Sequence, residues 1–135
     1  MSTSSAQIET VVLIVEDEPL QRLYVADLLC DAGYEVVEAG NAPAALELLE
    51  GREDVHLLFT DIQMPGAYDG LELIRRVHAR WPHIHLMVTS GGRTPEGAEY
   101  PQKSRFIPKP FSPGEFFRHF YELTPPRASS ASLAR

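Results

Sequence analysis

Acidic residues, a hydroxyl pair and a lysine stand where four apolar runs of the sequence end. The acidic run 16–18 (EDE) follows VVLIV, and Asp61 follows VHLLFT. The pair Thr89-Ser90 closes IHLMVTS, and Lys109 comes directly after RFIP. Clustered carboxylates repel one another, and a hard cation such as Mg²⁺ relieves that repulsion. An ammonium and a hydroxyl beside them would hold phosphoryl oxygens, so the set predicts phosphoryl transfer with Asp61 as a carboxylate nucleophile.

The segments between these residues predict the elements that must bring them together. Short runs typical of strands occur at 11–15, 34–39, 55–60, 84–89 and 105–107. Helical patterns occupy 19–33, 41–51, 70–81 and 113–123. This alternation predicts an α/β fold with a doubly wound, five-stranded parallel sheet between helices. Parallel strands end at a common edge, where ligands bind in such sheets, so the polar strand ends are expected to meet there.

Details of the helical segments give further expectations. In the first helix the expected buried face comprises Leu20, Leu23, Tyr24, Ala26, Leu28 and Cys30. Asn41 is placed to cap the second helix. The segment 91–104 contains three Gly and two Pro, which predicts an irregular or shortened fourth helix.

Composition limits the function classes. The chain has 135 residues, 44% apolar and 23% charged, which predicts one folded domain, at 10–123, between flexible tails at 1–9 and 124–135. A formal net charge of −7 argues against binding nucleic acid or an anionic membrane. With one cysteine, no bilayer-length apolar run and no signal peptide, we expect a cytoplasmic protein.

Four stretches in order, VLIVEDEP, LLFTDIQMPGAYDGLELI, LMVTSG and FIPKPF, resemble the receiver domain of bacterial two-component response regulators. The resemblance covers residues 10–123 and implies a flavodoxin-like (β/α)5 fold. It implies that a phosphohistidine of a histidine kinase or a histidine phosphotransfer protein donates a phosphoryl group to the chain. The phosphorylated surface would then bind an unknown protein target or relay the phosphoryl group, with a homodimer left open. Twelve residues after the last helix are too few for an output domain, so a stand-alone regulator is expected.

The resemblance also implies a role for individual residues. Asp61 matches the phosphoacceptor, and the expected Mg²⁺ ligands are Glu16, Asp17, Asp61 and the backbone carbonyl of Gln63. Ser90 and Lys109 match the residues that bind phosphoryl oxygens, and Phe106 matches the aromatic switch. Gln63 and Gly92 match the two positions that set the rate of dephosphorylation. The Lys109–Pro110 peptide is expected to be cis.

Three alternatives stay open at this stage. Thr89 could replace Ser90 as the switch hydroxyl, although Gly91 after Ser90 and the alternation of strand side chains favour Ser90. The chain could be a pseudo-receiver, an interaction module that phosphorylation does not control. It could also be a small phosphohydrolase, although such enzymes place a second Asp two residues after the nucleophile, where this chain has Gln63. The favoured interpretation is a signalling phosphoacceptor that catalyses only its own phosphorylation and dephosphorylation, not an enzyme.

Overall fold

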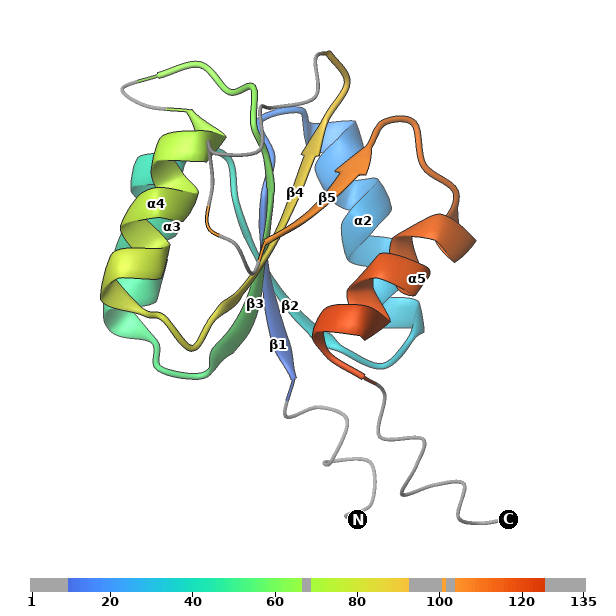
Figure 1. Cartoon of the computed structure of the whole chain (residues 1–135), viewed down its shortest axis with the longest axis horizontal. Coiled ribbons are helices and arrows are strands. Elements are labelled where there is room, and N and C mark those ends of the chain that lie inside the picture. Colours follow the sequence, from blue (N-terminus) through green and yellow to red (C-terminus); the bar gives the residue numbers. More distant parts are fainter. Residues whose placement is uncertain (1–9, 67–68, 93–100, 102–103, 126–135) are drawn as a thin grey trace, which may run out of the picture.

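Five parallel strands form a single sheet in the order β2-β1-β3-β4-β5 (Figure 1). The computed structural model describes residues 10–66, 69–92, 101 and 104–125. The strands are β1 (Val11–Val15), β2 (Glu35–Ala39), β3 (Val55–Asp61), β4 (His85–Ser90) and β5 (Arg105–Pro108). The helices are α2 (Pro19–Asp31), α3 (Ala42–Gly51), α4 (Gly70–Arg80) and α5 (Pro113–Leu123). The predicted flavodoxin-like α/β fold is confirmed.

Helices cover both faces of the sheet, with α3 and α4 on one side and α2 and α5 on the other (Figure 1). The central strand β1 is buried along its whole length. Its alternate side chains enter two cores, because successive strand residues point to opposite faces. Leu13 and Val15 pack with the α3–α4 side, whereas Val12 and Ile14 pack with the α2–α5 side. A strand with two apolar faces has to lie in the middle of such a sandwich.

The burial of α2 differs from the expectation. Its buried residues are Val25, Ala26 and Leu29, whereas Leu20 is 76% exposed and Leu23 is 52% exposed. Of the expected buried face, Tyr24 and Cys30 are also exposed, Leu28 is half-buried, and Ala26 alone is buried. Apolar residues surround most of this helix, so their spacing alone does not select the side that faces the sheet.

Local signals define the starts of the other helices. The Asn41 side chain accepts a hydrogen bond from the Ala44 N–H at 2.8 Å, as predicted. Asp69 caps α4 in the same way, and Ser112 forms a capping box with Glu115 at the start of α5. Each cap satisfies backbone donors that the first helical turn leaves without a partner.

Some expectations concern segments beyond the described residues. The predicted tail 1–9 and all but residues 124 and 125 of the predicted tail 124–135 lie outside them, as does most of the segment 91–104 with its expected irregular fourth helix. Among the residues that are described, no helix is long and apolar enough to cross a membrane.

Candidate functional site

The carboxyl ends of four strands bring the predicted site residues to one edge of the sheet. Asp61 is the last residue of β3 and Ser90 the last of β4, while Glu16 follows β1 and Lys109 follows β5. Glu16 and Ser90 are each 3% exposed and Asp61 is 6% exposed. Two carboxylates that are nearly removed from water need compensating partners, because burial without pairing is costly for a charge.

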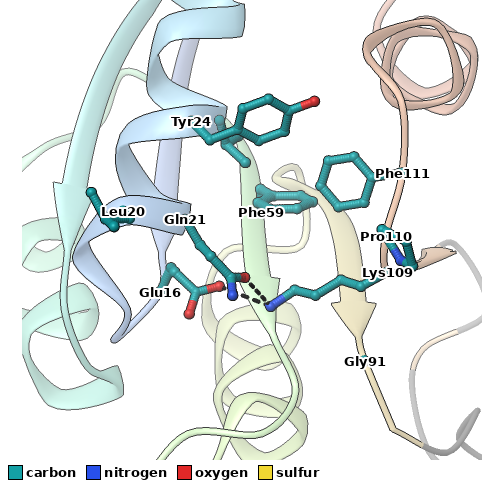
Figure 2. Close-up of a pocket in the computed structure, with 10 residues that line it drawn as sticks. Glu16, Leu20, Gln21, Tyr24, Phe59, Gly91, Lys109, Pro110 and Phe111 are labelled. Atoms are coloured by element: carbon teal, nitrogen blue, oxygen red, sulfur yellow. Dashed lines mark hydrogen bonds and ion pairs between the residues drawn. The ribbon is translucent and has the colours of Figure 1, made fainter.

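The Lys109 ammonium is the main partner of both carboxylates. Its Nζ donates to Asp61 Oδ2 at 2.6 Å and to Glu16 Oε1 at 3.3 Å. A third bond goes to Gln21 Oε1, at 2.5 Å. Figure 2 shows the Lys109 side chain reaching from its loop to Glu16 and Gln21. One cation thus joins the ends of β1 and β3 and the first turn of α2.

Backbone N–H groups bind the remaining carboxylate oxygens. The Gln63 N–H donates to Asp61 Oδ1 at 2.9 Å, and the Glu18 N–H donates to Glu16 Oε2 at 3.1 Å. Each carboxylate is therefore held by an ammonium on one oxygen and by an amide on the other. This arrangement fixes the orientation of the Asp61 carboxylate.

The pKa values of Glu16 and Lys109 both rise above their ordinary values. Burial raises the pKa of the Glu16 carboxyl above 4.5, and the Asp61 charge adds to this effect against the opposing Glu18 N–H and Lys109. Burial lowers the pKa of Lys109, but its hydrogen bond to Asp61 and the charges of Asp61 and Glu16 outweigh that effect and raise it above 10.5. Lys109 is consequently a stable cation at neutral pH.

The loop after β5 is held against the end of β4. The Lys109 N–H donates to the Ser90 carbonyl oxygen at 3.0 Å, which continues the pairing of the two strands. The Lys109–Pro110 peptide is cis, as predicted. Gly91 has no side chain, and a Cβ placed there would lie 3.8 Å from the aliphatic part of Lys109. These contacts set the direction from which the lysine enters the acidic edge.

The two candidate switch hydroxyls have different surroundings. Thr89 Oγ1 donates to the Ile107 carbonyl oxygen at 2.7 Å and is fully buried between β4 and β5. Ser90 Oγ lies at the tip of β4, where it accepts the Gly92 N–H at 3.2 Å. The Thr89 hydroxyl is already used within the sheet, so this geometry favours Ser90, whose role as the switch stays a prediction.

Gln63 and Gly92 lie against each other near Asp61. A Cβ added at Gly92 would lie 2.8 Å from Gln63 Nε2, closer than real contacts allow. Because residue 92 has no side chain, the Gln63 amide can occupy this position. Their predicted effect on dephosphorylation stays a prediction, although the two positions do adjoin.

Phe106 and Asp17 complete the predicted set. Phe106 lies on β5 next to Val88 and is partly buried against the α3–α4 core, and its role as an aromatic switch stays a prediction. Asp17 follows Glu16 and has an exposed side chain. Exposure leaves its carboxylate accessible to an ion from solvent.

The donors at this edge suit a hard cation. Glu16, Asp17, Asp61 and the Gln63 carbonyl supply oxygen atoms only, which is the donor type that Mg²⁺ prefers. In this arrangement Lys109 neutralises Glu16 and Asp61, and within the described ranges no three Asp, Glu, His or Cys side chains converge as a ready metal centre. The donor chemistry fits Mg²⁺, and the expected ligand set stays a prediction.

A pocket of about 550 Å³ opens beside the Lys109 side chain (Figure 2). It lies between the first turns of α2 and the loop that follows β5, with Glu16 and Lys109 at its polar end and Tyr24, Phe59 and Phe111 lining its apolar part. Gln21 also lines this pocket, and the interpretation of the sequence did not include it. The available signal was its place in the first helical turn after the acidic run, two residues beyond Pro19.

Comparisons with known proteins identify a family for the chain. The family model of the response regulator receiver domain matches residues 12–120. The chain is 34% identical over 104 residues to the response regulator receiver protein CpdR of Brucella abortus (strain 2308), covering 74% of this chain and 84% of that protein. It is 30% identical over 117 residues to the sensor protein TorS of Escherichia coli (strain K12), covering 82% of this chain. The chain spans only 13% of the length of TorS.

A solved structure shows the same fold. The response regulator protein TrrA of Thermotoga maritima, in complex with Mg²⁺-BeF, aligns with a TM-score of 0.74 at 23% identity, covering 84% of this chain and 98% of that one. At this identity the likeness concerns the fold alone. Together with the family match over 12–120 and the identity to CpdR, the site geometry leads to one conclusion: the chain belongs to the receiver domain family of two-component response regulators.

Proposed function

We propose that this receiver domain accepts a phosphoryl group on Asp61 from a phosphohistidine of a histidine kinase or a histidine phosphotransfer protein. The observation that carries the proposal is the contact of Lys109 Nζ with Asp61 Oδ2 at 2.6 Å, at the buried end of β3, where the same ammonium also binds Glu16. A carboxylate with a fixed cation beside it can serve as a nucleophile whose product, a phosphoryl dianion, is already matched in charge.

In the proposed step an oxygen of the Asp61 carboxylate attacks phosphorus in line. The new O–P bond forms as the P–N bond to the donor imidazole breaks, and the imidazole leaves with the bonding electron pair. Lys109 contributes an ammonium that can bind a phosphoryl oxygen, and Glu16 and Asp17 provide carboxylates for a metal. Mg²⁺ bound there would neutralise charge on the transferring group.

We further propose that phosphorylation changes the surface through Ser90 and Phe106. The Ser90 hydroxyl stands at the end of the strand next to β3, within the edge that would carry the new dianion. A hydrogen bond from this hydroxyl to a phosphoryl oxygen would move the tip of β4. Phe106 lies beside Val88 on the adjacent strand and would shift with it, which alters the face offered to a protein target.

The domain acts as a signalling phosphoacceptor in the cytoplasm, and its own phosphorylation and dephosphorylation are the only reactions that it catalyses. Its phosphorylated form binds a protein target or passes the phosphoryl group on. Gln63 occupies the place where a phosphohydrolase needs a second carboxylate, which supports this choice over turnover of external phosphate esters.

The direct test is transfer from a phosphorylated histidine kinase to the purified chain with Mg²⁺. Labelled phosphate is expected on the wild type and to be absent from Asp61→Asn, because the amide cannot act as the nucleophile. Asp27→Asn, an exposed position on α2, serves as the matched control and should be labelled like the wild type.

Equal labelling of the wild type and Asp61→Asn would remove Asp61 from the role. No labelling by any kinase of the host, nor by a small-molecule phosphodonor, would instead support a pseudo-receiver.

A further inference from the structure

Gln21 makes the shortest of the three hydrogen bonds of the Lys109 ammonium. The distance from Nζ is 2.5 Å to Gln21 Oε1, compared with 2.6 Å to Asp61 Oδ2 and 3.3 Å to Glu16 Oε1. An ammonium has three hydrogen-bond donors and no acceptor, so the amide oxygen of Gln21 is the atom that must face it. The three acceptors therefore use the full donor capacity of Lys109.

The first turn of α2 is attached firmly to the end of β1, which gives Gln21 a fixed place. Arg22 Nη1 donates to the Glu16 carbonyl oxygen at 2.6 Å, and the Arg22 N–H donates to the Glu18 carbonyl oxygen at 2.9 Å. Arg22 also forms an ion pair with Glu38 on the neighbouring strand β2. Gln21, the residue before Arg22, is carried by this anchored turn toward the lysine (Figure 2).

We propose that Gln21 is a positioning residue that holds the Lys109 ammonium beside Asp61. This inference rests on the proposed function and extends it to a residue outside the expected metal and phosphoryl ligands. Glu16 and Asp61 are both expected to give oxygen atoms to Mg²⁺, which leaves less of their charge for Lys109. Gln21 is neutral and outside that set, so its oxygen stays available to the ammonium when the carboxylates are engaged.

Loss of this acceptor should slow phosphorylation without altering the nucleophile. Met has a similar length to Gln and no amide oxygen, so Gln21→Met leaves Lys109 with two protein acceptors instead of three. A hydrogen bond to a charged group changes an equilibrium by about one to two factors of ten when it is lost without replacement. Water can reach the exposed Gln21, which reduces the loss, so we expect the phosphorylation rate to fall about fivefold.

The experiment measures phosphorylation of Asp61 by acetyl phosphate with Mg²⁺, in which acetate leaves as the O–P bond to Asp61 forms. Four chains are compared: wild type, Gln21→Met, Lys109→Met and the double variant. Leu23→Met introduces the same residue on the same helix at an exposed position and serves as the matched control. The same four chains are also unfolded with urea in the absence of phosphodonor, which gives the coupling energy of the pair from stability alone.

The proposal requires a non-additive result. Gln21→Met should slow phosphorylation when Lys109 is present and have no effect when residue 109 is Met, while Leu23→Met behaves like the wild type. An equal effect of Gln21→Met in both backgrounds, or none in either, would overturn it. If neither acetyl phosphate nor a phosphorylated histidine kinase labels the wild type, the proposed function fails by itself. In that case, or if Lys109→Met reacts too slowly to measure, the free energies of unfolding of the four chains test the inference. A coupling energy between Gln21 and Lys109 supports it, and additive effects of the two substitutions overturn it.

Discussion

At the scale of single residues, the site is a balance between burial and pairing. Glu16 and Asp61 are nearly buried, and burial disfavours the charged form of a carboxylate. Lys109 offsets that cost for both, and amide donors at Gln63 and Glu18 complete the pairing. The raised pKa of Glu16 indicates that the compensation is incomplete at this residue. Binding of the proposed Mg²⁺ would offset the remaining cost of burying this carboxylate.

A pH series tests this reading of Glu16. Below its ordinary pKa of 4.5 the carboxyl is protonated in both folded and unfolded chains and contributes nothing to the pH dependence. As the pH rises the unfolded chain loses its proton first, so the folded protein loses stability until its own higher pKa is passed. We therefore expect Glu16→Gln to gain stability relative to the wild type as the pH rises from 4.5 toward neutrality.

The measurement is urea unfolding in EDTA, so that no divalent ion contributes. Glu47→Gln, an exposed position on α3, controls for the general loss of a carboxylate. Parallel stability curves for Glu16→Gln and the wild type across this pH range would contradict the prediction.

At the scale of elements, the start of α4 packs closely against the end of β3, the strand that carries Asp61. The Gly70 N–H donates to the Ile62 carbonyl oxygen at 2.9 Å, directly after β3. A Cβ at Gly70 would lie 2.1 Å from the Asp61 carbonyl oxygen and 2.8 Å from Ile62 Cα. Both neighbours are backbone atoms, which cannot turn aside as a side chain end can. The glycine thus lets α4 begin in contact with the loop that follows Asp61.

Replacement of Gly70 by Ala should therefore destabilise the domain. We expect a loss of about 1–3 kcal/mol in the free energy of unfolding, since the start of α4 or the loop after β3 has to move. Urea unfolding followed by circular dichroism measures it. Gly51→Ala is the matched control, because a Cβ there meets no atom within 4 Å. Equal stability of the two variants would show that the approach of α4 to Asp61 is looser than the structure indicates.

The sequence predicted the elements and the edge that they share, but not every side chain on it. Each described strand and helix lies within two residues of its expected bounds, because β-branched runs and capping residues are local signals. The predicted buried face of α2 was wrong. Apolar residues lie on most of the surface of this helix, so the packing against the sheet and α5 decides which of them are buried. Gln21 was missed for a related reason: its contact with Lys109 joins residues 88 positions apart and depends on how α2 is anchored.

At the scale of the whole molecule, Mg²⁺ should stabilise the fold. An ion that binds only the folded chain adds about 2.7 kcal/mol to the free energy of unfolding when its free concentration is about 100-fold above Kd. We expect the thermal unfolding midpoint to rise with Mg²⁺ in the wild type, and Asp17→Asn to reduce the rise by removing an exposed carboxylate of the expected ligand set. Asp27→Asn should respond like the wild type. An identical response of all three chains would exclude Asp17 as a ligand.

The placement of the first and last described elements has a practical consequence. β1 begins and α5 ends at the side of the sheet remote from the acidic edge (Figure 1). A reporter or a surface tether joined before Val11 or after Leu123 would therefore start from the side opposite Asp61. In a domain immobilised in this way, the edge that carries Asp61 would face away from the surface and toward the donor protein proposed above.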